Sequence, residues 1–109
     1  MYEYQAAVIN VVDGDTIEVA IDLGFHVTIH ERVRIYGVDT PERGQPGWAE
    51  ATAFTTALVT GKTLTANTVK GVDKYGRFLA VLRTVDGLEV AAAIIAAGLG
   101  VPYFGGKKA

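Results

Sequence analysis

The first third of the chain alternates between apolar and polar positions in the manner of β-strands. Three runs rich in valine, isoleucine and threonine predict strands at residues 5–12, 16–21 and 27–38. The Asp13-Gly14 pair between the first two runs is a strong hairpin signal, because both residue types tolerate the backbone angles of a tight turn. The chain is therefore expected to begin with three strands.

The pattern then changes to a helical period. Over residues 48–59, three apolar side chains recur at helical spacing, at Ala51, Phe54 and Leu58. The run stops at Gly61, and glycine commonly lies just past the last turn of a helix. The sequence therefore predicts an amphipathic helix here.

Two more strand-like runs, at residues 63–70 and 77–84, are joined by a polar turn. An alanine-rich segment at 90–97 then predicts a second short helix, which ends at Gly98. Three strands, a helix, two strands and a helix suit an α+β fold: a five-stranded Greek-key OB-fold β-barrel with two short helices. The outer face of such a barrel can bind an oligonucleotide, although a fold alone does not establish a function.

Length and composition narrow the protein class. A chain of 109 residues has room for one core, so we expect one domain over residues 1–104 and a flexible tail at 105–109. No cysteine is present, which excludes disulfides, thiolate metal sites and cysteine nucleophiles. The net charge of −2 argues against a broad basic face for long duplexes. The sequence shows neither the pattern of a secretory signal nor an apolar run long enough to span a membrane. A soluble protein is therefore expected, and the sequence does not indicate its cellular compartment.

Three short motifs combine charged residues with turns: 13–16 (DGDT), 34–42 (RIYGVDTPE) and 73–77 (DKYGR). Each has a plain alternative. An isolated Asp-Gly pair is usually only a hairpin turn, residues 39–42 have the spacing of a helix capping box, and lone basic residues are usually solvated. In their order and spacing the motifs resemble the staphylococcal nuclease (thermonuclease-like) family over nearly the whole chain.

This resemblance implies a calcium-dependent nuclease that hydrolyses phosphodiester bonds in DNA, RNA or both. It implies that Asp15, Asp39 and the backbone carbonyl of Thr40 hold the calcium ion. Hard Ca²⁺ prefers oxygen ligands, and a site with two carboxylates and one carbonyl leaves positions open for water and a substrate phosphate.

The resemblance also implies the catalytic groups. Glu42 is expected to act as the general base that activates water, and Arg34 and Arg77 to bind the phosphate and stabilise its growing charge. Guanidinium groups suit this role because their planar fork matches phosphate oxygens. Positions that bind substrate phosphate and sugar in the family correspond to Lys74, Tyr75 and Tyr103.

Other readings stay open at this point. Members of the same family that have lost catalytic residues serve as modules that bind nucleic acid or protein, whereas this chain keeps the full charged set.

Few cations are available, so a single-stranded substrate is expected. Apolar residues at 101–104 suggest a monomer that folds them back or a weak homodimer. His26 and His30 lie in strand-like sequence and are expected to be structural or surface residues.

Overall fold

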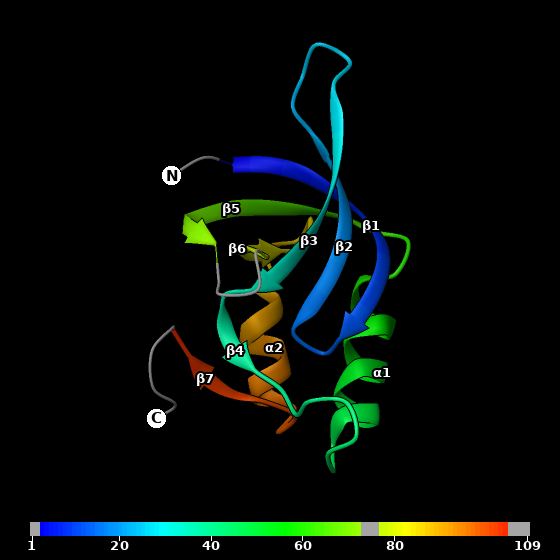
Figure 1. Ribbon diagram of the computed structural model, residues 1–109, viewed down its shortest axis with the longest axis vertical. Helices are drawn as coiled ribbons and strands as arrows, with labels where there is room; N and C mark the ends of the chain where they lie inside the picture. Colours follow the sequence, from blue (N-terminus) through cyan, green and yellow to red (C-terminus); the bar gives the residue numbers. More distant parts are fainter. Residues whose placement is uncertain (1–2, 73–76, 105–109) are drawn as a thin grey trace.

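The structure, a computed structural model, describes residues 3–72 and 77–104, and the side chains of these residues except 70–72 (Figure 1). Five strands close into a barrel in the order β1-β2-β3-β6-β5. Neighbouring strands are antiparallel except β3 and β6, which are parallel. The strands are β1 (Glu3–Asp13), β2 (Thr16–Asp22), β3 (Thr28–Ile35), β5 (Thr63–Val72) and β6 (Phe78–Arg83). The predicted OB-type barrel is confirmed.

Both predicted helices are present, as α1 (Trp48–Val59) and α2 (Val90–Ala96). On α1 a stripe of Ala51, Thr55 and Val59 is buried, at the i, i+4 spacing that places side chains on one helical face. The Thr55 hydroxyl donates a hydrogen bond of 2.7 Å to the carbonyl of Gly14. This bond ties α1 to the turn between β1 and β2.

The predicted strand over residues 27–38 is wrong in one respect, because it is two strands. The barrel strand β3 ends at Ile35, and a separate strand, β4 (Gly37–Asp39), leaves the barrel. The amide of Tyr36 still bonds to the carbonyl of Ala80 in β6, at 2.8 Å. Gly37 then takes a φ of 101°, which a side chain would disfavour and which turns the chain out of the barrel.

A further strand, β7 (Val101–Tyr103), was not predicted and pairs antiparallel with β4. The two strands lie close, since a Cβ at Gly100 would lie 2.7 Å from Val38 Cγ2. Phe104 packs its ring edge-on against Tyr36, with ring centroids 5.4 Å apart, yet remains 64% exposed. The expected folding back of this apolar segment is therefore partial.

The core lies inside the barrel and between the barrel and α2. Its largest fully buried side chains include Ile17, Ile35, Leu64, Leu82 and Ile94. Both helices lie at one end of the barrel, and the β2–β3 hairpin projects from the other end (Figure 1). Within the described ranges, no helix combines the length and the apolar character needed to cross a membrane.

Candidate active site

Asp15 is fixed by contacts on three sides in the turn between β1 and β2. Its carboxylate accepts hydrogen bonds from the Thr16 hydroxyl and from the Thr40 amide, each at 3.0 Å. Its backbone carbonyl accepts a bond of 2.8 Å from the amide of Ile35 at the end of β3. A buried carboxylate with these partners has little rotational freedom, so its position is set by the fold.

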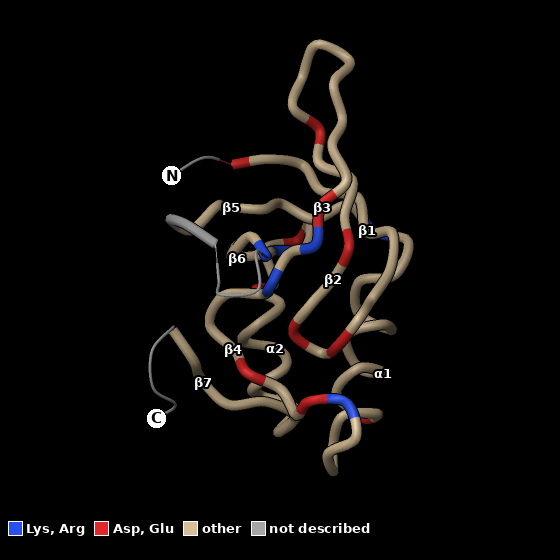
Figure 2. Tube along the Cα trace, viewed as in Figure 1, with Lys and Arg blue, Asp and Glu red and all other residues tan. Residues whose placement is uncertain are grey.

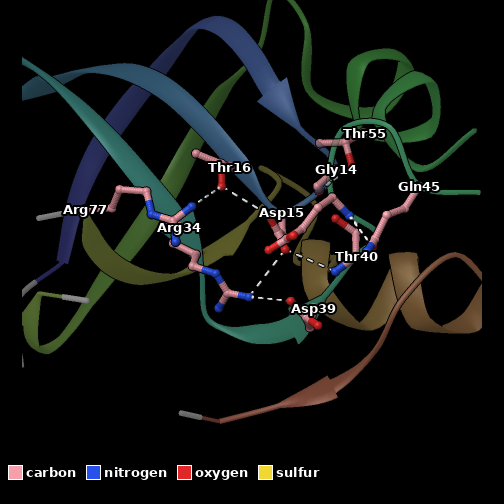
Figure 3. A network of polar contacts seen from close by, with 10 residues as sticks. Gly14, Asp15, Thr16, Arg34, Asp39, Thr40, Gln45, Thr55 and Arg77 are labelled. Atoms are coloured by element: carbon pink, nitrogen blue, oxygen red, sulfur yellow. Dashed lines mark hydrogen bonds and ion pairs between the residues drawn. The ribbon is translucent and has the colours of Figure 1, made fainter. Parts of the chain in front are cut away.

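Arg34 joins two carboxylates from different elements (Figure 3). Since Val33 and Ile35 face the core, strand alternation turns Arg34 to the outer face of β3. Its Nη2 lies 3.3 Å from Asp15 Oδ2 and 3.0 Å from Asp39 Oδ1, and the Arg34 side chain is only 9% exposed. One nearly buried cation therefore holds two acidic groups together.

Arg77 approaches the same cluster from the position just before β6. Its Nη1 donates to the Thr16 hydroxyl at 3.1 Å, and that hydroxyl donates in turn to Asp15. Tyr103 approaches from β7, with the Arg34 guanidinium carbon 5.1 Å from its ring centroid. Thus β2, β3, β4, β7 and the residue just before β6 all contribute to one cluster of polar groups.

Glu42 lies on the exposed loop between β4 and α1. Its backbone amide donates to Gln45 Oε1 at 3.3 Å, so a local turn orders this part of the loop. Further along, the guanidinium carbon of Arg43 lies 4.7 Å from the Trp48 ring centroid, a cation–π contact. The Trp48 indole N–H donates to Asp13 at 2.7 Å, which ties the loop to the first hairpin.

The capping-box alternative for residues 39–42 is not realised. The helix α1 begins only at Trp48, and its N-cap is Gly47, which makes no side-chain capping bond. The Thr40 amide bonds to the distant Asp15 rather than within a helix turn. Thr40 therefore makes a tertiary contact with the first hairpin instead of a helix cap.

Charged residues of both signs surround the cluster. In Figure 2, Lys and Arg positions gather along β3 and β6, while Asp and Glu positions mark the β1–β2 turn and the segment after β4. A polyanion bound at this cluster would meet arginines and carboxylates together. Carboxylates facing a phosphate require a cation between them to offset the repulsion.

The donor set of the cluster fits a hard cation. Asp15 and Asp39 supply carboxylate oxygens that converge on a single nitrogen of Arg34. Oxygen ligands of this kind suit Ca²⁺ and Mg²⁺. In the described part of the chain no three or more His, Cys, Asp or Glu side chains form a closed metal cage. A cation held by the two aspartates therefore needs backbone oxygen, water or substrate as further ligands.

The structure brings most of the predicted site residues together. Side-chain or backbone contacts connect Asp15, Arg34, Asp39, Thr40, Arg77 and Tyr103. Glu42 is joined to this cluster only along the backbone, two residues beyond Thr40. The predicted Lys74 and Tyr75 lie outside the described residues. His26 and His30 are exposed on the projecting hairpin, as expected of surface residues.

Two members of this region were not singled out from the sequence. Thr16 connects Asp15 with Arg77, and Trp48 anchors the loop that carries Glu42. Thr16 belongs to the first motif, so its position next to Asp15 in the sequence could have indicated a role in the site. Trp48 gave no comparable signal, because its partner Asp13 is 35 positions away.

Comparisons with known proteins show which sequences this chain is similar to. A sequence model of the family described as "Staphylococcal nuclease homologue" matches residues 32–108. Two curated relatives, one from Escherichia coli O157:H7 and one from Escherichia coli, are both named "Uncharacterized endonuclease". Each is 36% identical to this chain over 96 residues, which covers 88% of this chain and 59% of the relative. The chain thus spans about three fifths of the length of the curated relatives it matches.

Proposed function

The chain belongs to the staphylococcal nuclease homologue family, and on this premise we propose that it is a calcium-dependent nuclease that hydrolyses phosphodiester bonds in DNA, RNA or both. One observation carries the proposal. Arg34 bridges Asp15 and Asp39 while Arg77 is joined to the same cluster through Thr16. The family and the endonuclease name of the relatives support the same chemistry.

The metal would be held by Asp15, Asp39 and the backbone carbonyl of Thr40. A bound calcium ion would supply positive charge that offsets the repulsion between these carboxylates and the phosphate. Oxygen ligands and the convergence of the two carboxylates support this assignment.

The two arginines would bind the phosphate from separate parts of the chain, Arg34 from β3 and Arg77 from the position just before β6. Among the described residues, the bonds of Arg34 to the aspartates use only Nη2, which leaves the donors on Nε and Nη1 for phosphate oxygens. Negative charge on these oxygens grows as the phosphorus becomes five-coordinate, so fixed donors stabilise the transition state more than the ground state. Arg77, the residue just before β6, would add a second guanidinium, which its bond to the Thr16 hydroxyl holds beside the cluster.

Glu42 would act as general base on the attacking water. Its carboxylate takes a proton while the water oxygen forms a bond to phosphorus, the opposite P–O ester bond breaks, and the leaving oxygen takes a proton from solvent. Its exposed position gives a water molecule access. The bond between its amide and Gln45, and the Trp48 anchor, limit how far the loop can move.

The substrate would be a single-stranded or locally opened polynucleotide. Contacts with substrate phosphate and sugar are proposed for Lys74, Tyr75 and Tyr103. The net charge of −2 leaves no broad cationic surface for a duplex, which favours a flexible strand that can follow a small site.

The test is cleavage of single-stranded DNA and RNA in calcium and then in chelator, with Glu42→Gln beside wild type. Losing a general base costs about 10²–10⁴-fold in rate, while binding in calcium should be largely retained. Glu50→Gln, at an exposed position in the first turn of α1, is the matched control and should cleave like wild type. If wild type binds these substrates but cleaves neither, a non-catalytic binding module takes the place of the nuclease.

A further inference from the structure

The β2–β3 hairpin presents an aromatic side chain in a fixed conformation. At its tip Gly24, Phe25 and His26 all have positive φ, of 78°, 52° and 61°. This backbone region is unfavourable for residues with side chains, and it is retained where surrounding contacts impose it. Two backbone bonds of 2.9 Å, from Leu23 to Val27 and from Val27 to Gly24, impose it here. As a result the side chain of Phe25 is held 98% exposed.

The apolar surface continues from the tip to the barrel. Leu23, Val27 and Ile29 on the hairpin are exposed, as is Phe78 at the start of β6. Scattered apolar residues are normal on a surface, but a contiguous patch on a small protein marks an interaction site. The hairpin itself projects from the end of the barrel opposite the helices (Figure 1).

The same end of the barrel opens into an apolar cavity of about 170 Å³. All five barrel strands line it, and alanines occupy three of the inward positions: Ala6, Ala66 and Ala80. Small side chains leave space that larger ones would fill. An apolar cavity of about 150 Å³ binds benzene in another protein, so this cavity has room for one aromatic ring.

One carboxylate stands in the cavity lining. Glu31 is half-buried between apolar inward neighbours of β3 and has no hydrogen bond or ion pair with the part of the chain that the structure describes. A partly buried charge in apolar surroundings is costly unless it meets a cation or a donor. The rim of the cavity is therefore suited to an aromatic group with a basic or donor group beside it.

The outer edge of the hairpin is open as well. In β3, residues 28–32 pair with β2 alone, because the described pairing with β6 begins only at Val33. An open strand edge can accept a further strand through backbone hydrogen bonds.

We propose that this end of the barrel binds a second copy of the chain in a two-fold symmetric dimer. Phe25 of each copy enters the cavity of the other, and His26 comes to the rim beside Glu31. The hairpin tip supplies an aromatic ring, which the apolar cavity has room for, and next to it an imidazole, which can donate a hydrogen bond to the Glu31 carboxylate. Since tip and cavity lie at the same end of one molecule, a single two-fold axis satisfies both contacts.

Two copies placed in this way lay their hairpins antiparallel to each other. The open β3 edges then face one another and can pair. The arrangement is separate from the candidate active site, which lies at the β1–β2 turn and the ends of β3 and β4, so it goes beyond the proposed nuclease function.

The first test is sedimentation velocity over a concentration series. Wild type should show a reversible monomer–dimer equilibrium, and Phe25→Ser should raise its dissociation constant at least tenfold. Val85→Ser is the matched control, because Val85 is equally exposed, at 95%, in a turn outside the hairpin. Its dissociation constant should match wild type. A wild type that stays monomeric at its highest soluble concentration, or a Phe25→Ser dimer of unchanged affinity, overturns the proposal.

The second test uses the reciprocity of the contact. Ala66→Leu fills the cavity from a buried position in its lining. An equal mixture of Phe25→Ser and Ala66→Leu restores one intact contact per heterodimer, so it should associate more tightly than either variant alone. No gain on mixing two folded variants overturns the reciprocal geometry. If Ala66→Leu does not fold, the fully exposed Phe25→Ser still decides the outcome.

Two further measurements separate this proposal from other outcomes. Monomeric wild type whose melting temperature rises with benzene would show a small-ligand cavity and overturn the dimer. Phe25→Ser should cleave nucleic acid like wild type. Sedimentation therefore tests the dimer and cleavage tests the nuclease proposal, so the failure of one can be told from the failure of the other.

Discussion

At the scale of single residues, Gly14 shows how closely the candidate site and the helix packing depend on each other. A Cβ at this position would lie 2.9 Å from Ala51 Cβ and 3.0 Å from Thr40 Oγ1. The neighbouring Ala51 Cβ is attached directly to the α1 backbone and cannot rotate away. The turn that carries Asp15 can therefore pack under the helix only if residue 14 has no side chain.

Gly14→Ala should lower the free energy of unfolding by about 1–3 kcal/mol, the usual cost of overpacking a tight contact. Urea unfolding measures this change. Ala51→Gly removes the opposing Cβ, so the double variant should be more stable than the sum of the two single effects predicts. If the two effects simply add, the contact between residue 14 and Ala51 Cβ is not the cause of the destabilisation.

The guanidinium of Arg34 lies between two carboxylates and offsets the repulsion between them. Its removal in Arg34→Met leaves both uncompensated, and breaking a buried ion pair by removing one partner costs about 3–5 kcal/mol. Calcium should offset part of this loss by binding the same carboxylates, so it should raise the melting temperature of the variant more than that of wild type.

Thermal unfolding in calcium and in chelator measures this difference without reference to activity. Arg32→Met, on the same strand but with an exposed side chain, is the control and should show no enlarged calcium effect. An Arg34→Met variant that gains no more from calcium than wild type would place the metal elsewhere.

At the scale of elements, the β2–β3 pair contains an ion pair that links stability to pH. Hydrogen bonds from Arg32 and then from Asn10 lower the pKa of the Glu18 carboxyl below its ordinary value. Arg32 Nη2 lies 2.9 Å from Glu18 Oε2, and both side chains are substantially exposed. Solvent therefore screens the pair and keeps its contribution small.

Because the pKa of Glu18 is lower in the folded than in the unfolded chain, the pair stabilises the fold above the unfolded-state pKa. This stabilisation is lost as the pH falls through the folded-state pKa. Glu18→Gln should therefore be slightly less stable than wild type at neutral pH, with the difference vanishing in acid. Urea midpoints across this range test the prediction, and a gap that widens in acid would contradict it.

At the scale of the whole molecule, the balance of charge governs how a polyanion binds. The protein has 10 lysines and arginines against 12 aspartates and glutamates, so net attraction must come from local groups. Two of these cations, Arg34 and Arg77, belong to one cluster. Affinity for nucleic acid should therefore depend only weakly on salt.

The dependence can be measured by fluorescence anisotropy of labelled single-stranded DNA with Glu42→Gln, which should bind in calcium without cleaving. Each neutralised phosphate contributes roughly 0.7 to the slope of log affinity against log salt for single strands. A slope that corresponds to six or more released counterions would reveal a far larger basic surface than we expect.

The sequence by itself determined the elements of the barrel and most members of the candidate site. Strand alternation and helical spacing are local patterns, so they located the five barrel strands and both helices. The charged motifs are likewise local, and their resemblance to the staphylococcal nuclease family pointed to Asp15, Arg34, Asp39 and Arg77. Lys74 and Tyr75 remain predictions, since they lie outside the described residues.

Only the tertiary structure decided which of these groups touch. Thr16 connects Arg77 to Asp15, and Trp48 bonds to Asp13 across 35 positions, because the barrel brings distant strands and loops together. The same holds for β4 and β7, whose pairing joins residues 37–39 to 101–103. Local periodicity carries no information about which distant segments become neighbours, since that choice depends on how the whole core packs.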